Sequence, residues 1–314
     1  MFLISLVLSC LTLTFPITAQ DAKKKAAPPR EAINVLIVDG QNNHDFVSTT
    51  QSLRASLIAV GLFRVDASMS PSRRASRSTW DRWKPDFASA DVVVVNYNGL
   101  LWPEHVRTAF EKFVREGGGV VFVHASNNAF SGWKEYNLMI GLGWRNNKFD
   151  KRLTIDDTTG KHIITPRGEG PGAGHGPRHA FPIKVRQPNH PIMKGLPAVW
   201  MHAQDELYHG QRGPAENMTV LSTALSAKKR RGTGAHEPIT WVIPYGKGRC
   251  VTTVLGHQGR GQKPRPSLEC VGFQVVFARS VEWAATQKVT IPVPKNFPSA
   301  NKELIVSPTG RKRR

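Results

Sequence analysis

The run from Gly117 to Ala125 constrains the fold of this chain more than any other segment. Three glycines precede four apolar residues, and the run reaches His124 where the chain must turn. In open α/β sheets, ligands bind at the carboxyl ends of the strands. Enzymes that form acyl intermediates place Ser or Cys at such a turn, whereas an imidazole favours a base, a proton shuttle or a metal ligand. The run therefore predicts a buried strand that ends at a functional site.

The N-terminal half alternates short apolar runs with amphipathic segments. Strands are expected at 33–38, 63–67, 91–97 and in the run that ends at His124. Helices are expected from about 46 to 60 and from 103 to 116. Continuous valine-rich runs suit strands that are buried on both faces. This order of elements predicts an α/β fold, with a doubly wound, mostly parallel sheet and helices on both faces.

The C-terminal half is less regular. Residues 145–180 read as irregular, with a glycine-rich loop at 168–179, and a loop of that length is either functional or disordered. Further strands are expected at 181–185, 219–221, 238–243 and 249–255, with a helix at 267–285. We assign 33–285 to one domain and 286–314 to a basic C-terminal tail.

The first residues are typical of an export signal. Residues 1–19 are apolar and almost uncharged, which predicts a signal peptide cleaved near Ala19 and a secreted or periplasmic protein. Residues 20–32 then form a linker. An uncleaved anchor is the alternative, because no Lys or Arg precedes the apolar stretch. No second segment is long enough to span a membrane, so no stable membrane insertion is expected after cleavage.

The formal net charge is +20, and much of it lies in short Lys/Arg clusters. The clusters fall in expected loops and termini, where a solvated surface is the simplest interpretation, and anionic polysaccharide is the alternative partner. They lack interleaved aromatic residues, so no nucleic acid is expected. Cys250 and Cys270 are the two cysteines that remain after cleavage, and they form either one disulfide or two buried thiols.

Several histidines lie where strands are expected to end. His44, His124 and His257 each follow an apolar run, and these ends meet along one edge of a parallel sheet. The segment 202–209 contributes three further candidates for a functional site, namely Asp205, Glu206 and Tyr208.

Two kinds of chemistry remain open for these residues. In the first, His44, His124, Glu206 and His257 hold a divalent metal such as zinc or manganese, with one position open. In the second, an acid beside a histidine acts as base and orienter, and Tyr208 stabilises an oxyanion. The structural alternative is a set of core or capping histidines. This alternative is preferred for the loop histidines, namely His162, His175, His179 and His236.

Substrate-binding candidates are aromatic or amide side chains. Trp133, Trp144 and Trp200 can stack on a sugar face, but tryptophan is also a common core residue. Asn127 and Asn128 follow His124, where they either contact a ligand or cap a helix.

Taken in order, these segments resemble the ThuA-like proteins, which are named for trehalose utilisation. The resemblance covers about 33–285. It rests on Asn43–Asp45, Gly117–Ala125, His190–Ile192 before Gly195, Asp205–Tyr208, Pro238–Trp241, Tyr245–Arg249 and Leu255–His257. Residues 141–147 depart from the family pattern, which changes one wall of the expected pocket.

The resemblance implies a flavodoxin-like, class I glutamine-amidotransferase-like fold and a role in carbohydrate metabolism. By position it implies a site at His44, His124, Asp205, Glu206, Tyr208 and His257. The amidotransferase relatives have a cysteine where His124 stands, so glutamine hydrolysis is not expected. No nucleotide cofactor is expected either.

The leading hypothesis is a metal-dependent lyase or hydrolase that acts on a sugar or a 3-keto-glycoside. The alternative is a non-catalytic sugar-binding module that docks on an anionic glycan or cell surface. A serine hydrolase is disfavoured because the chain lacks a G-x-S-x-G elbow.

Overall fold

The valine-rich runs form a parallel sheet in the computed structural model, which describes residues 31–308. Five strands lie in the order β2-β1-β3-β4-β13, and every neighbouring pair is parallel. Their bounds are β1 Ile33–Asp39, β2 Phe63–Met69, β3 Val92–Val95, β4 Gly119–Val123 and β13 Gly248–Thr253. All four residues of β3 and all five of β4 are buried. This half of the sheet confirms the doubly wound α/β prediction.

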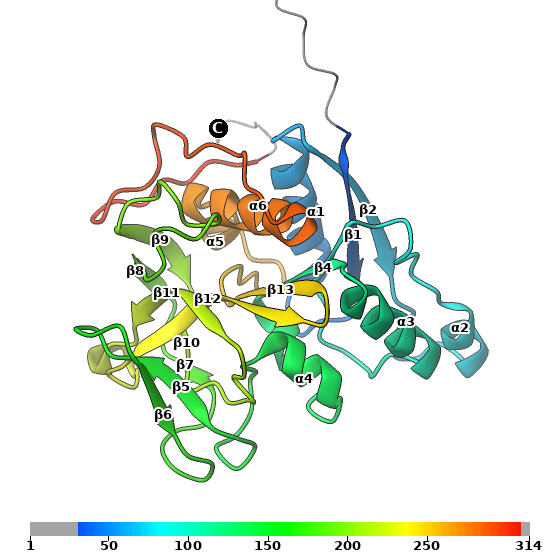
Figure 1. Ribbon diagram of the computed structural model, residues 1–314, viewed down its shortest axis with the longest axis horizontal. Coiled ribbons are helices and arrows are strands. Elements are labelled where there is room, and N and C mark those ends of the chain that lie inside the picture. The colour runs from blue at the N-terminus through cyan, green and yellow to red at the C-terminus, as the bar shows by residue number, and fades with distance from the viewer. Residues whose placement is uncertain (1–30, 309–314) are drawn as a thin grey trace, which may run out of the picture. The chain divides into compact units, whose positions relative to one another are not determined.

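The sheet continues beyond β13 through antiparallel strands (Figure 1). A tight turn at Gly246 reverses the chain between β12 and β13, so the two strands pair antiparallel. The order from β13 onward is β12 (His236–Tyr245), β11 (Thr219–Leu225), β8 (His179–Val185) and β9 (Val199–Asp205). A hairpin of β5 (Arg152–Ile155) and β6 (His162–Thr165) attaches to β12, and β7 (Gly174–His175) pairs separately with β10 (Tyr208–His209).

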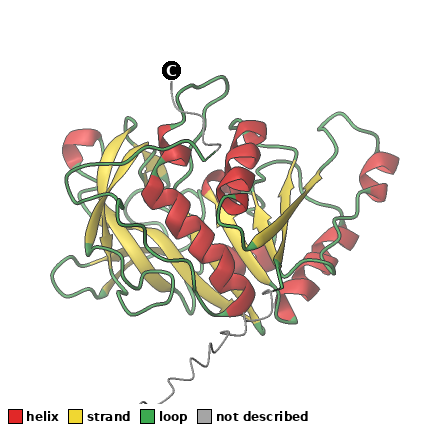
Figure 2. Ribbon diagram, turned by 90° about the horizontal axis from the view of Figure 1, so that it is seen from above, coloured by secondary structure: helices red, strands yellow, loops and turns green. Residues whose placement is uncertain are grey.

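Helices cover both faces of the sheet, as expected (Figure 2). One face carries α1 (Phe46–Ile58), α5 (Pro266–Glu269) and α6 (Val271–Thr286). The other carries α3 (Glu104–Arg115) and α4 (Lys134–Ile140), and the short α2 (Arg77–Arg82) precedes β3. In α3 the buried residues Val106, Phe110 and Val114 recur every four positions, which is the spacing that keeps one helix face on the sheet.

The structure corrects the expected helix at 267–285. Cys270 has extended backbone angles and separates α5 from α6. It forms an isolated β-bridge with Ile305, and the amide of Val271 donates to the carbonyl of Leu304 at 2.9 Å. The returning chain therefore takes hydrogen bonds that a continuous helix would have made internally.

The described part of the segment assigned to a tail, up to residue 308, packs on the domain. Ile291 is buried, and Phe297 packs against Trp200 with ring centroids 5.6 Å apart. The packed domain thus extends beyond the predicted boundary at 285. The predicted signal peptide, nearly all of the predicted linker and residues 309–314 lie outside the described residues.

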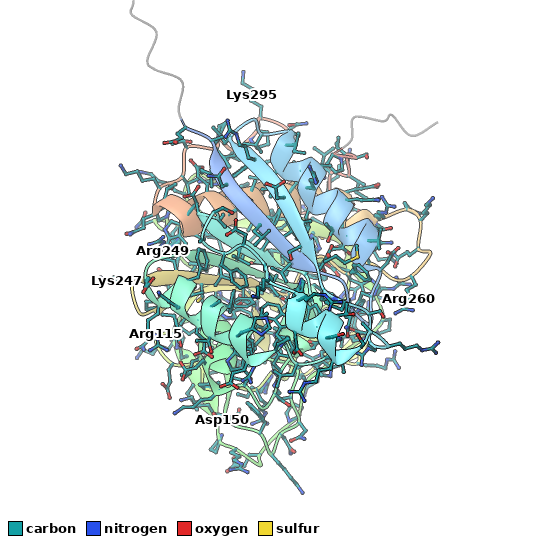
Figure 3. All side chains as sticks on the ribbon, turned by 90° about the vertical axis from the view of Figure 1, so that its right-hand side faces the viewer. Arg115, Asp150, Lys247, Arg249, Arg260 and Lys295 are labelled. Atoms are coloured by element: carbon teal, nitrogen blue, oxygen red, sulfur yellow. The ribbon has the colours of Figure 1, made fainter. Side chains whose placement is uncertain are left out.

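Most basic residues of the described chain are exposed, whereas Arg145, Arg152, Arg212 and Arg279 are buried. Figure 3 shows Arg115, Lys247 and Arg249 near one another and Arg260 at the opposite edge. The clusters at 73–74 and 228–231 are exposed, the first in a turn and the second in a short 3-10 helix, Lys228–Arg230, and the residue after it. Cys250 and Cys270 are both buried free thiols. Among the described residues, no helix has the length and apolar character needed to cross a membrane.

A buried ion pair joins the β5–β6 hairpin to the main sheet. Arg152 of β5 donates to the carboxylate of Glu237 on β12, and the two residues are 8% and 1% exposed. Glu237 also accepts from the hydroxyl of Thr233 and from the amide of Gly210.

We expect Glu237→Ala to lower the free energy of unfolding by about 3–5 kcal/mol, because it leaves the buried guanidinium of Arg152 without its carboxylate. The measurement is urea unfolding. Asp157→Ala is the control, since Asp157 pairs with Lys184 and Arg186 at an exposed position, and such pairs contribute at most about 1 kcal/mol. Equal small losses in both variants would contradict the role of the buried pair.

Candidate active site

The predicted meeting of histidines at the carboxyl edge of the sheet is present in the structure. His44 lies in the loop after β1, His124 follows β4 directly, and His257 comes four residues after β13. The ring centroid of His44 lies 4.8 Å from that of His124 and 4.9 Å from that of His257. Glu206, in the turn between β9 and β10, completes the group.

The carboxylate of Glu206 is the centre of this site. Its Oε2 lies 3.7 Å from Nε2 of His124 and 3.8 Å from Nε2 of His44. Its Oε1 lies 3.2 Å from Nε2 of His257 and 3.6 Å from Nε2 of His175. Burial raises the pKa of Glu206, but the surrounding imidazoles outweigh that effect and hold it below its usual value.

His124 occupies a strained position at the end of β4. Its φ is +46°, a value that non-glycine residues adopt rarely and that is typical of functional sites. Its Nδ1 lies 2.7 Å from the carbonyl of Val254, and its Nε2 lies 3.1 Å from the hydroxyl of Tyr208. Burial, together with the charges of His44 and His257, lowers the pKa of His124 to about 3, so the ring is neutral at pH 7.

The hydrogen-bond partners place a hydrogen on Nδ1 of three rings. A carbonyl only accepts, so Nδ1 of His124 and Nδ1 of His175 each carry the hydrogen, the latter donating to the carbonyl of Gly176 at 2.7 Å. Nδ1 of His44 lies 3.3 Å from Oδ1 of Asn42, which already accepts from the amide of His44.

The other ring nitrogen of these histidines, Nε2, is directed at the site. Nε2 of His44 and Nε2 of His175 lie 3.8 and 3.6 Å from the carboxylate of Glu206, and Nε2 of His124 lies next to the hydroxyl of Tyr208. The outer hydrogen bonds of the rings are the kind that orient metal-binding histidines.

The ligand atoms that can share one ion belong to His44, Glu206 and His257, and they lie within 4.8 Å of one another. His124, expected as a further metal ligand, borders this group. Its Nε2 instead lies within hydrogen-bond distance of the hydroxyl of Tyr208. Burial raises the pKa of Tyr208 well above its usual value, so the phenol keeps its proton.

Asp205 has a different position from the one expected of a catalytic residue. It is fully buried, and its carboxylate accepts from the amides of Glu206, Gly256 and His257 at 2.6, 3.0 and 3.3 Å. It also contacts Nε2 of His202 at 2.8 Å. Asp205 therefore positions two members of the site, Glu206 and His257, through their backbone amides.

Two of the predicted sugar-stacking residues lie in the core. Trp133 is 4% exposed within a cluster of aromatic rings and donates to Glu111. Trp200 is 1% exposed and lies against Gly272 of α6. Both expectations are corrected, because Trp133 packs against residues of α3 and α4, and Trp200 of β9 packs against α6. Trp144 instead lies at the site, half-buried, with its ring 4.7 Å from that of Tyr208.

The two predicted asparagines differ. Asn127 is fully buried and donates to the carbonyl of Leu142 at 3.3 Å and to Gln211, so it holds the turn after His124. Asn128 is partly exposed, hydrogen-bonds to Tyr208, and has a buried Oδ1 without a partner in the structure.

His175 is the site residue that the sequence analysis missed. It was grouped with the loop histidines because it lies in the glycine-rich segment 168–179. The others of that group lie elsewhere, with His162 exposed on β6 and His236 3.4 Å from Asp157. The signal available in the sequence is the length of the glycine-rich segment, because a loop of that length is either functional or disordered.

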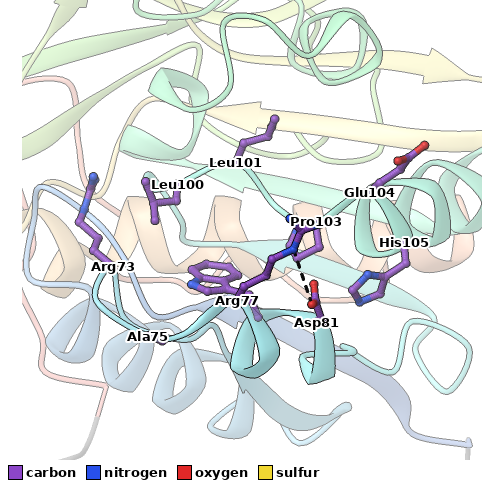
Figure 4. Close-up of a pocket in the computed structure, with 10 residues that line it drawn as sticks. Arg73, Ala75, Arg77, Asp81, Leu100, Leu101, Pro103, Glu104 and His105 are labelled. Atoms are coloured by element: carbon purple, nitrogen blue, oxygen red, sulfur yellow. Dashed lines mark ion pairs between the residues drawn. The ribbon is translucent and has the colours of Figure 1, made fainter.

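A separate hollow of about 830 Å³ lies beside α2 (Figure 4). Leu100, Leu101 and Trp80 line it, and Arg77 forms an ion pair with Asp81 at 3.9 Å. None of the predicted site residues is among those that line this hollow.

Comparisons with known proteins identify the family of the chain. The family model described as ThuA, trehalose utilisation, matches residues 34–284. A crystal structure of a ThuA-like protein from Parabacteroides merdae ATCC 43184 is 38% identical, with a TM-score of 0.84, and the match covers 90% of this chain and 100% of that one. A ThuA-like protein from Bacteroides uniformis ATCC 8492, 17% identical with a TM-score of 0.52, shares the fold over 84% of this chain and 96% of that one. No match was found among curated proteins. The resemblance inferred from the sequence is thereby confirmed, and this chain belongs to the ThuA (trehalose utilisation) family.

Proposed function

We propose that this protein binds a divalent metal ion, zinc or manganese, and acts on a sugar or 3-keto-glycoside by acid–base chemistry at the Glu206 site. The observation that carries the proposal is the pair of imidazoles of His44 and His257, whose Nε2 atoms lie 3.8 and 3.2 Å from the one carboxylate of Glu206. We also propose that residues 1–19 are an export signal cleaved near Ala19, and that the protein acts as a secreted or periplasmic protein.

His44, Glu206 and His257 would hold the ion, because two imidazoles and a carboxylate are a common ligand set of catalytic zinc sites. When bound, such an ion supplies a positive charge that stabilises a developing oxyanion. These three residues also fix the position of a substrate carbonyl relative to the His124–Tyr208 pair.

His124 and Tyr208 are suited to move the protons. A ketone at C3 of a sugar acidifies the hydrogen on C2. The neutral Nε2 of His124 takes that hydrogen as a proton, and its electron pair forms the C1=C2 bond as the bond from C1 to the glycosidic oxygen breaks. The leaving oxygen takes the phenolic proton of Tyr208, and His124 returns its proton to Tyr208 across their 3.1 Å contact.

Removing the central carboxylate should abolish metal binding. We expect Glu206→Gln and His257→Gln each to weaken zinc or manganese affinity by more than about 100-fold, since even outer partners of metal ligands contribute 10–100-fold. Affinity is measured by competition with a chromophoric chelator. His162→Gln is the control, because His162 is an exposed histidine of β6, and it should bind the ion as the wild type does. Unchanged affinity in Glu206→Gln would contradict the assignment.

The proton-transfer pair should affect turnover without affecting the ion. On 3-keto-glycosides, we expect His124→Ala and Tyr208→Phe to lower kcat by about 10²–10⁴-fold, the usual contribution of a positioned acid or base. Release of the alcohol is followed chromatographically, and metal content is checked in parallel. Trp133→Phe, a change in the core, is the control. Full turnover by His124→Ala would exclude this mechanism, and glycoside binding by the wild type without any turnover would identify a sugar-binding module.

A further inference from the structure

The segment from Pro166 to His175 contains a glycine at every second position from 168 to 174. Such a sequence has little conformational preference of its own, since glycine is the least restricted residue. Yet the segment ends at His175, whose ring belongs to the site. Something outside the segment must therefore set its position.

Arg212 is the residue that holds this segment. It is fully buried, and its guanidinium donates only to backbone carbonyls. Nη1 donates to Pro166 at 3.0 Å, and Nη2 donates to Pro171 at 2.7 Å and also to Glu169. One planar fork thus binds three carbonyls of the segment, a geometry that a lysine ammonium does not reproduce.

The segment is also confined by close backbone contact. A Cβ on Gly210 would lie 2.2 Å from the carbonyl oxygen of Gly172. The backbone of Arg212 pairs with Gly143 through two hydrogen bonds of 2.9 and 3.1 Å. Arg212 is therefore a fixed anchor.

The anchored segment delivers His175 to the site. Gly174 and His175 pair with His209 and Tyr208, so a shift of the segment moves the imidazole directly. In this register the rings of His175 and Tyr208 are nearly parallel, with centroids 6.3 Å apart. Nε2 of His175 reaches to 3.6 Å from Glu206.

His175 also differs from the other imidazoles in exposure. Its side chain is 35% exposed, against 12% for His44, 4% for His124 and 8% for His257. Its ring lies 5.8 Å from that of Trp144, which can supply an apolar face for a sugar. Of these four imidazoles His175 is the most accessible to an incoming ligand, and its Nε2 can hydrogen-bond to a hydroxyl.

We propose that His175 is the imidazole that contacts the substrate, and that Arg212 is the positioning residue that places it through the glycine-rich segment. The substrate-contact part rests on the proposed function, whereas the positioning part does not.

The positioning part is tested without turnover, by NMR of protein labelled at histidine Cε1. His175→Gln identifies the His175 signal. We expect Arg212→Lys to shift and broaden that signal while the signals of His44 and His257 stay in place. Arg167→Lys is the matched control, because Arg167 is an exposed arginine of the same segment that donates to the carbonyl of Lys148. An unmoved His175 signal in folded Arg212→Lys would overturn the positioning role of Arg212. Shifts of all the site histidine signals would also overturn it, because they would show that Arg212 only supports the fold.

The contact is tested with methyl α-D-glucopyranoside and its 3-keto derivative. His175→Gln should keep wild-type metal affinity and raise KM for the keto-glycoside by roughly tenfold, the loss expected for one hydrogen bond. Arg212→Lys should raise KM similarly, and the double variant should be no worse than either single one. Additive losses, or lost metal affinity in His175→Gln, would overturn the proposal. If wild type neither binds nor converts either glycoside, the proposed function fails for this substrate class and the substrate-contact part fails with it, whereas the NMR result still decides the positioning role.

Discussion

The buried carboxylate of Asp205 is the interaction on which the site depends. It joins the turn after β9 to the loop after β13 by accepting from the amides of Glu206 and His257. Burial alone would raise the pKa of Asp205, but its bonds to His202 and Ser267 hold that pKa well below the usual range, so it stays charged. Two segments separated by about fifty residues are thereby held in one register, and a charged acceptor makes stronger hydrogen bonds than a neutral one.

The second constraint is electrostatic. The rings of His44, His124 and His175 each have Nδ1 beside a local acceptor, which leaves Nε2 directed at the site. Burying the carboxylate of Glu206 among them is costly unless an opposite charge compensates it. The same arrangement separates two roles, because His44 and His257 flank the carboxylate while His124 faces Tyr208. The site thus offers an ion position and a proton path side by side.

Much of this was predictable from the sequence, for identifiable reasons. A parallel sheet brings the residues after its strands to one edge, so His44, His124 and His257 could be placed together without coordinates. Glu206 and Tyr208 could be identified because the segment 202–209 is dense in functional side chains. The resemblance of the chain to a known family, through the order and spacing of its motifs, pointed to the same residues. The antiparallel strand β9 was missed because its sequence, Val199–Asp205, mixes apolar and polar residues with functional ones.

The remaining features depend on tertiary contacts that no local pattern reveals. Trp133 and Trp200 were candidates by residue type, and only packing shows that they are buried. His175 was passed over because its position depends on Arg212, which is distant in sequence and binds main-chain carbonyls. The segment that follows residue 285 read as a tail because its contacts, such as that of Ile305 with Cys270, join positions far apart in the chain.

The central claim is that a divalent ion is bound between two imidazoles and the carboxylate of Glu206. The most direct measurement is anomalous diffraction from crystals of the purified protein grown with zinc or manganese, recorded on both sides of the absorption edge. The account predicts an anomalous peak bordered by His44, Glu206 and His257. A peak only elsewhere on the protein, or none at saturating ion concentration, would contradict it.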